Sequence, residues 1–152
     1  DAMLSKKLWG HVEDLYGPHS VDLMSLDSNV MRDSRGQPLK HFTPFRSPET
    51  SGIHVFTQIL RYERNPYVFP PFRMIFPLIK FLIEQRVEGC TVVLPQVYPL
   101  PAWWPIVKNY SKSKTLLATI GDSEALLYPT RDGFVVDKFG LKFNLWVFRC
   151  AV

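Results

Sequence analysis

Between residues 67 and 94 the chain alternates between strand and helix patterns, and this alternation restricts the possible folds most. Residues 67–69 have strand composition and end at two prolines, whereas the apolar residues of 74–85 recur at helical spacing. Residues 90–94 carry no charge and stop at Pro95, which is typical of a central strand buried on both faces. We therefore expect an α/β domain with a mostly parallel sheet, in which strands 67–69 and 91–94 are joined by the helix.

The flanking segments carry weaker patterns of the same kind. Apolar residues at helical spacing predict helices over 4–16 and 103–110, and Pro77 and Pro105 are expected in the first turns of their helices. An Asp-Gly turn near residue 132 predicts an antiparallel hairpin in the C-terminal part. Further strands are expected at 20–24, 40–43 and 140–149, the last of them antiparallel and near an edge, whereas residues 54–60 fit either a strand or a helix.

Length and composition indicate one globular domain spanning residues 1–152. Apolar residues make up 46% of the chain and charged residues 21%, and the net charge is +4. Cys90 and Cys150 have no zinc-ligand spacing and suit buried positions in a reducing compartment, so we expect a nuclear or cytoplasmic protein. No apolar run approaches a membrane span, and the four histidines have no metal-ligand spacing, so neither a membrane anchor nor a metal site is predicted.

The double proline after strand 67–69 is the most unusual local motif. It places a rigid backbone and an aromatic ring at the carboxyl end of a strand, where open α/β sheets bind ligands. Amino-methyltransferases use Asp or Asn, Pro, Pro and then an aromatic residue at such a position to hold a target amine. In this chain the motif reads Phe69, Pro70, Pro71 and Phe72. Phe69 cannot accept the required hydrogen bond, and the prolines also fit a purely structural role as the end of a buried strand.

Cofactor and surface candidates are equally short motifs. Asp22 and Ser25 follow a strand that lacks the usual glycine turn, so Asp22 is either a remnant cofactor ligand or an acid that caps a strand end.

Basic residues predominate over 28–80, and two surface patches are predicted. One is basic (Arg61, Arg64, Arg73) and the other is aromatic (Trp103, Trp104, Tyr110). The aromatic patch favours a protein partner or self-association, whereas the basic patch predicts weak nucleic-acid binding.

Several motifs in this order resemble one family. Residues 16–25, 67–72, 91–95 and 101–105 are similar to the C-terminal region of the reverse transcriptase–RNase H polyprotein of DIRS-like tyrosine-recombinase retrotransposons. That region is similar in turn to Dam-type N6-adenine methyltransferases. The resemblance covers roughly residues 8–149. It implies a Rossmann-like methyltransferase fold, with Asp22 and Ser25 beside the cofactor pocket and 69–72 at the catalytic loop.

The chain departs from the family pattern at both functional positions. Phe69 stands where the family has Asp or Asn, and Leu23, Met24 and Ser25 are bulky where the cofactor needs space. We therefore expect a catalytically degenerate, retroelement-derived methyltransferase-like domain that binds a protein or a nucleic acid, with no cofactor. The alternative is an active N6-adenine methyltransferase that uses S-adenosylmethionine and takes its polar residue from Asn65-Pro66-Tyr67.

Overall fold

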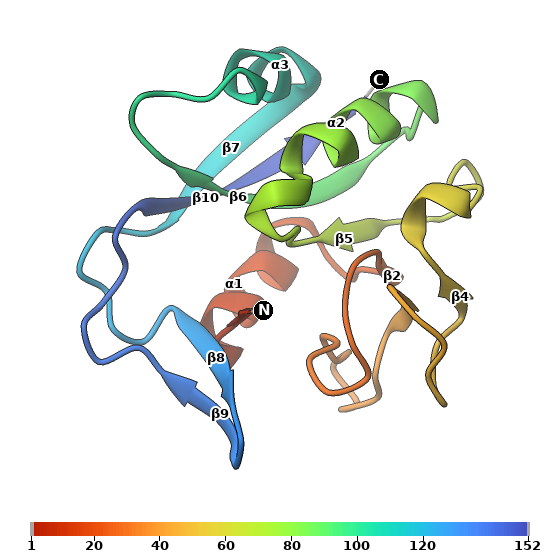
Figure 1. Cartoon of the computed structure of the whole chain (residues 1–152). Coiled ribbons are helices and arrows are strands. Elements are labelled where there is room, and N and C mark those ends of the chain that lie inside the picture. Colours follow the sequence, from red (N-terminus) through yellow and green to blue (C-terminus); the bar gives the residue numbers. More distant parts are fainter. Residues whose placement is uncertain (1, 152) are drawn as a thin grey trace.

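A seven-stranded, mostly parallel sheet forms the centre of the molecule in the computed structural model, which describes residues 2–151 (Figure 1). Its strand order is β4-β3-β2-β5-β6-β10-β7, and β10 runs antiparallel to both of its neighbours. The other pairs within the sheet are parallel. The strands are β2 (Val21–Asp22), β3 (Lys40–Thr43), β4 (Gly52–Ile53), β5 (Pro66–Val68), β6 (Cys90–Gln96), β7 (Ser111–Ala118) and β10 (Asn144–Cys150).

The predicted central unit is confirmed. Strands β5 and β6 pair in parallel, with Tyr67 opposite Thr91 and Val68 opposite Val92, and α2 (Ile75–Glu84) connects them. Pro77 is the third residue of α2, and Pro105 is the third residue of α3 (Trp103–Tyr110), so both lie in first turns as expected. The first helix, α1 (Lys6–Tyr16), begins later than predicted because the Ser5 side chain caps it by accepting a hydrogen bond from the Leu8 amide.

The predicted hairpin exists, but it does not belong to the large sheet. Strands β8 (Leu126–Thr130) and β9 (Gly133–Val136) pair through the expected turn, and β8 also pairs with β1 (Met3–Leu4) to give a separate three-stranded sheet. The antiparallel strand of the large sheet is β10, which lies between β6 and the edge strand β7, so the predicted antiparallel strand near an edge is confirmed. The turn signal is local, whereas the choice of sheet depends on contacts with the other end of the chain.

Two strands differ from the sequence expectation. β6 continues through Pro95, which is opposite Leu145 of β10. Because β5 ends opposite Val92, the second half of β6 has a sheet neighbour on the β10 side only, and a residue without an N–H is tolerated there. β7, which sequence patterns did not predict, is an edge strand whose Lys112 and Lys114 are exposed. Lysine is typical of edge strands because it discourages pairing with another chain.

Two hydrophobic cores cover the two faces of the large sheet. Helices α2 and α3 pack on one face, with Val92 and Leu94 of β6 turned toward them. Helix α1 and the small sheet pack on the other face, toward which Val93 and Leu145 are turned. Figure 1 shows the same arrangement, with α2 and α3 on one side of the sheet and α1 with β8 on the other. Residues 90–94 are buried throughout, as expected of a strand covered on both faces.

Candidate functional site

A cavity of about 600 Å³ opens at the carboxyl ends of the parallel strands. Its wall takes Leu23–Leu26 from the end of β2, Thr43 from β3, residues 54–56 after β4 and Phe69–Met74 after β5. In open α/β sheets this edge is where ligands bind, because loops from neighbouring parallel strands meet there. The volume lies within the range of small-molecule sites. The structure thus brings Ser25 and the double-proline motif into one wall.

The double-proline segment forms an apolar part of this wall. Phe69 is half-buried and packs against the core that covers the α1 face of the sheet. Phe72 is 48% exposed, and its ring meets that of Phe143 edge-on, with 5.2 Å between the centroids. Pro70 and Pro71 also line the cavity. The position that would hold a polar acceptor in the family therefore carries an aromatic side chain that is committed to packing.

Asp22 and Ser25 have different environments. Asp22 is buried beneath the cavity and does not line it; its Oδ2 accepts a hydrogen bond from the Met31 amide at 3.3 Å. Burial raises the pKa of the Asp22 carboxyl to about 7, despite the backbone amides and the nearby His41 that act in the opposite direction. Ser25 lines the cavity, and its hydroxyl has no hydrogen-bond partner among the described residues. Asp22 thus holds the loop that leads to Met31, and of the two residues only Ser25 lines the cavity, with its hydroxyl oxygen sealed from solvent.

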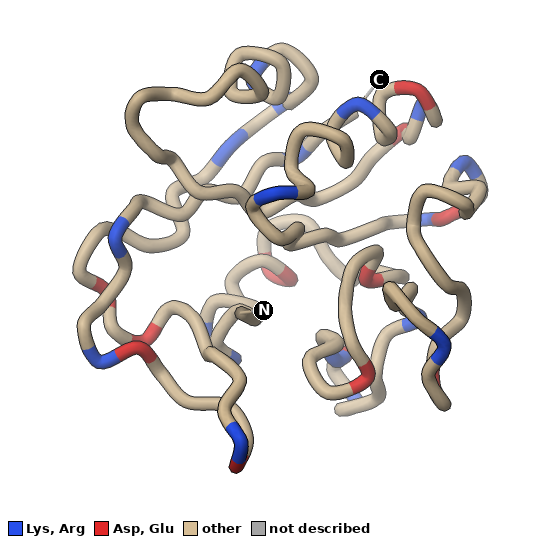
Figure 2. Tube along the Cα trace, viewed as in Figure 1, with Lys and Arg blue, Asp and Glu red and all other residues tan. Residues whose placement is uncertain are grey.

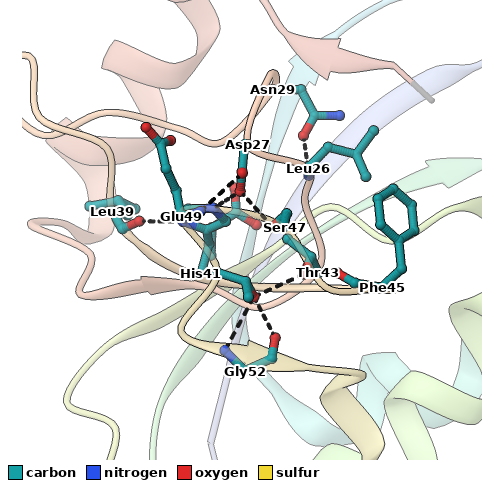
Figure 3. A network of polar contacts seen from close by, with 12 residues as sticks. Leu26, Asp27, Asn29, Leu39, His41, Thr43, Phe45, Ser47, Glu49 and Gly52 are labelled. Carbon is teal, nitrogen blue, oxygen red and sulfur yellow. Dashed lines mark hydrogen bonds and ion pairs between the residues drawn. The ribbon is translucent and has the colours of Figure 1, made fainter.

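A polar network fixes the loops that follow β2 and β3 (Figure 3). One oxygen of Asp27 contacts His41 Nε2 at 2.8 Å and accepts from the Ser47 hydroxyl at 3.0 Å, and its second oxygen accepts from the Glu49 amide at 3.1 Å. The hydrogen bond with His41, the largest contribution, lowers the pKa of Asp27. On the cavity side, Asn29 Oδ1 accepts from the Leu26 amide at 2.7 Å. These bonds hold the wall formed by residues 23–29 in one conformation.

Charge at the cavity is sparse. Arg73 is the one charged residue in the wall, and within residues 2–151 no carboxylate lines it. Arg61 and Arg64 precede β5, whereas Arg73 follows it, so the predicted basic patch is divided between the two ends of this strand. Figure 2 shows basic residues spread over the molecule, several of them with acidic residues close by along the chain. Lys40 also pairs, at 2.6 Å, with Glu63 from a distant part of the chain.

The predicted aromatic patch is wrong. Trp103 and Trp104 are 8% and 5% exposed and belong to the core beneath α3, where Trp104 meets Phe148 edge-on. Tyr110 is also buried, with its hydroxyl 3.5 Å from the Val87 carbonyl, and burial raises its pKa. The three residues lie on the face of α3 that packs against the sheet, because their spacing along the helix follows its apolar stripe.

Several wall residues could not be found from the sequence. Leu126, Tyr128 and Phe143 come from the small sheet and from the segment before β10, far along the chain from the double proline. His54 also lines the cavity and has a φ of 65°, a region that side-chain-bearing residues rarely adopt and that is enriched at functional sites. No local sequence pattern identifies either feature, because both depend on tertiary packing.

The described wall offers few acceptors for the cationic part of S-adenosylmethionine. This cofactor carries a positive sulfonium, an ammonium group and sugar hydroxyls, for which acceptors such as a carboxylate are suited, together with a carboxylate of its own. Within the described wall the one charge is the Arg73 guanidinium, which repels a cation. Leu23 and Met24 add bulk at the end of β2, where a cofactor-binding turn would need small residues. Residues 2–151 also hold no group of three potential ligands that could bind a metal ion.

Comparison with known proteins adds no assignment. No protein-family model matches the chain, and no curated protein matches it. Among the described residues, none of the helices is both long enough and apolar enough to cross a bilayer.

Proposed function

We propose that this chain is a methyltransferase-like domain that binds a ligand at the carboxyl edge of its sheet and transfers no methyl group. The observation that carries the proposal is the composition of the cavity wall. The motif position that would accept a hydrogen bond from a target amine is Phe69, and the wall around it is apolar and lacks a carboxylate. The cavity therefore lies where a catalytic site would lie, but its apolar side chains suit binding of a ligand rather than methyl transfer.

The topology supports the methyltransferase-like part of the proposal. One antiparallel strand, β10, is inserted next to the edge strand of an otherwise parallel seven-stranded sheet, which is compatible with the Rossmann-like fold that the resemblance implies. The double proline follows β5, which lies beside β2, so the two segments with family resemblance meet at one edge. A domain from a retroelement polyprotein, or a host protein derived from one, would preserve this arrangement.

The absence of methyl transfer follows from positioning. Transfer requires a nucleophilic amine held next to a bound methyl donor, and holding the two together provides much of the rate. The described cavity offers no acceptor at Phe69 for the amine and no anionic group for the donor. Without either interaction the two reactants are not held within reacting distance.

The alternative activity through Asn65 has less support. Asn65 lies before β5, at the end of the strand opposite the cavity. Its amide nitrogen donates to the carbonyls of Tyr16 and Pro18, each at 2.9 Å, and its Oδ1 accepts from Arg149 at 2.6 Å. The side chain is therefore engaged in structural contacts and is not free to hold a substrate amine.

The test is direct binding and transfer. Calorimetry with S-adenosylmethionine should show no binding at ligand concentrations up to about 1 mM, which corresponds to less than ~4 kcal/mol of binding free energy. Transfer of radiolabelled methyl groups to DNA and RNA should be absent, with an active N6-adenine methyltransferase as the positive control. Tight binding of S-adenosylmethionine, or transfer that is lost in Asn65→Ala, would overturn the proposal.

A macromolecular partner remains a prediction. With the tryptophans buried, a protein partner must use other surfaces, and nucleic-acid binding through Arg61 and Arg64 should be weak. Binding to short duplex DNA should lose affinity steeply with salt, with a slope of about −0.9 per phosphate contacted. If Arg61→Met and Arg64→Met leave both the affinity and the slope unchanged, these residues do not bind phosphate.

A further inference from the structure

Two residues of the cavity wall, Asn29 and Arg73, carry free hydrogen-bond donors. Asn29 is 7% exposed, and its Oδ1 is occupied by the Leu26 amide. Within residues 2–151 its amide nitrogen makes no hydrogen bond, yet it is not among the atoms that are sealed from solvent. Figure 3 shows this nitrogen on the far side of the amide from Leu26. Two N–H groups of a nearly buried side chain therefore remain available to an acceptor.

Arg73 adds a second donor at the rim. It lies in η2 (Phe72–Met74), directly after the double proline, and is exposed. Among the described residues it has no ion-pair partner. A guanidinium offers five donors and no acceptor, so it recognises carboxylate, sulfonate or phosphate oxygens.

Ser25 lines the wall, but its hydroxyl is not accessible from the cavity. It is the one buried side-chain polar atom without a partner in the described part of the chain, and its residue lines the same wall. The oxygen is sealed from solvent, so a ligand in the cavity meets the rest of Ser25 and not this hydroxyl.

The remaining wall is apolar. Side chains such as Met24, Phe42, Phe56 and Phe72 surround about 600 Å³ of space. A wall of this composition favours a hydrocarbon body, which gains from leaving water and from contact with aromatic rings.

We propose that the cavity binds an apolar ligand, aromatic or alicyclic, with a single anionic end that carries only acceptors. This inference rests on the proposed function, because it names the ligand class of the same binding site. Arg73 and Asn29 provide donors for the anion, and no carboxylate of residues 2–151 lines the wall. The sulfonium and ammonium groups of S-adenosylmethionine find no described carboxylate in this wall, whereas a ligand that carries only acceptors matches its donors.

A matched pair of fluorescent probes tests the ligand class. 8-Anilinonaphthalene-1-sulfonate is an aromatic anion, and N-phenyl-1-naphthylamine has the same rings without the sulfonate. We expect the folded chain to bind one molecule of the anion, about tenfold more tightly than the neutral probe, because one charge-assisted hydrogen-bond pair is gained at a partly exposed site.

Variants assign the binding to this cavity. Arg73→Met should weaken binding of the anion about tenfold and leave the neutral probe unchanged. Asn29→Asp keeps the acceptor for Leu26, removes the donors and adds a negative charge, so it should weaken binding of the anion further. Arg131→Met removes an exposed charge in the β8–β9 turn, outside the wall, and should change nothing.

The outcomes separate the two proposals. Equal affinity for both probes, with no effect of Arg73→Met, would overturn the anionic ligand class but keep a binding cavity. Failure of both probes to bind, with S-adenosylmethionine also inactive, would overturn the cavity as a binding site. Tight binding of S-adenosylmethionine in competition with the probes would overturn both proposals.

Discussion

The burial of Trp104 decides whether this side chain can bind a partner or stabilises the core. As an exposed side chain it would be an anchor for a partner, but it is 5% exposed and packs edge-on against Phe148, with the Lys114 ammonium 5.8 Å from its ring. Trp104→Ala should therefore lower the free energy of unfolding by roughly 3–5 kcal/mol through lost burial and a cavity. Urea denaturation measures the change.

Tyr62 provides the matched control for this substitution. It is 83% exposed, so Tyr62→Ala should change the free energy of unfolding by less than about 0.5 kcal/mol. If Trp104→Ala were as mild as Tyr62→Ala, the tryptophan would not be part of the core, and the aromatic surface patch would again be possible.

Among the elements, helix α2 has the clearest amphipathic division. Leu82 is fully buried against the sheet, whereas its neighbour Ile83 is 39% exposed. Leu82→Ala should cost roughly 2–5 kcal/mol of unfolding free energy, because it removes buried apolar contacts and leaves a cavity. Ile83→Ala should cost less than about 1 kcal/mol, since it loses little burial and alanine favours the helix. Similar losses for both would mean that α2 packs on a different face.

The same elements show which parts of the fold could be predicted from the sequence. The β5–α2–β6 unit and β3 follow from local periodicity, and the observed bounds are close to the expected ones. β7 was missed because alternating serine and lysine at an edge strand resembles a solvated loop. The cavity was predicted only at its double-proline wall and at Ser25, because its other side comes from the small sheet, which joins residues 3–4 to 126–136.

At the scale of the whole molecule, two buried groups respond to protons in opposite ways. Asp22 lies under the cavity, and its pKa is raised to about 7 by burial. His19 lies between α1 and the sheet, where it contacts Glu13 and, through Nε2, the Thr91 hydroxyl at 2.7 Å. Burial lowers the pKa of His19, although Glu13 partly opposes this. The charged form is disfavoured in both cases, which leads to opposite dependences on pH.

The direction in which stability changes with pH follows from the number of protons that the folded and unfolded states bind. Between pH 3.8 and about 7 the folded state holds a proton on Asp22 that the unfolded state releases, so its contribution is complete below pH 3.8 and is lost as pH rises through about 7. For His19 the unfolded state binds the additional proton, so its contribution is complete above pH 6.5 and is lost as pH falls through the lowered pKa. Just below pH 6.5 the two slopes have opposite signs and largely cancel.

Single variants should therefore reveal slopes that the wild type conceals. The difference between Asp22→Asn and the wild type isolates the Asp22 contribution, so stability relative to the wild type should rise with pH up to about 7. The difference between His19→Gln and the wild type isolates the His19 contribution, so it should fall as pH rises from the lowered pKa of His19 to 6.5. Each slope is limited to about 1.4 kcal/mol per pH unit, the value for one proton. Urea denaturation from pH 5 to 7.5 measures the differences from the wild type, which removes the contribution of all other titrating groups. If both variants run parallel to the wild type, neither group has a shifted pKa, and the buried carboxyl beneath the cavity is not protonated at neutral pH.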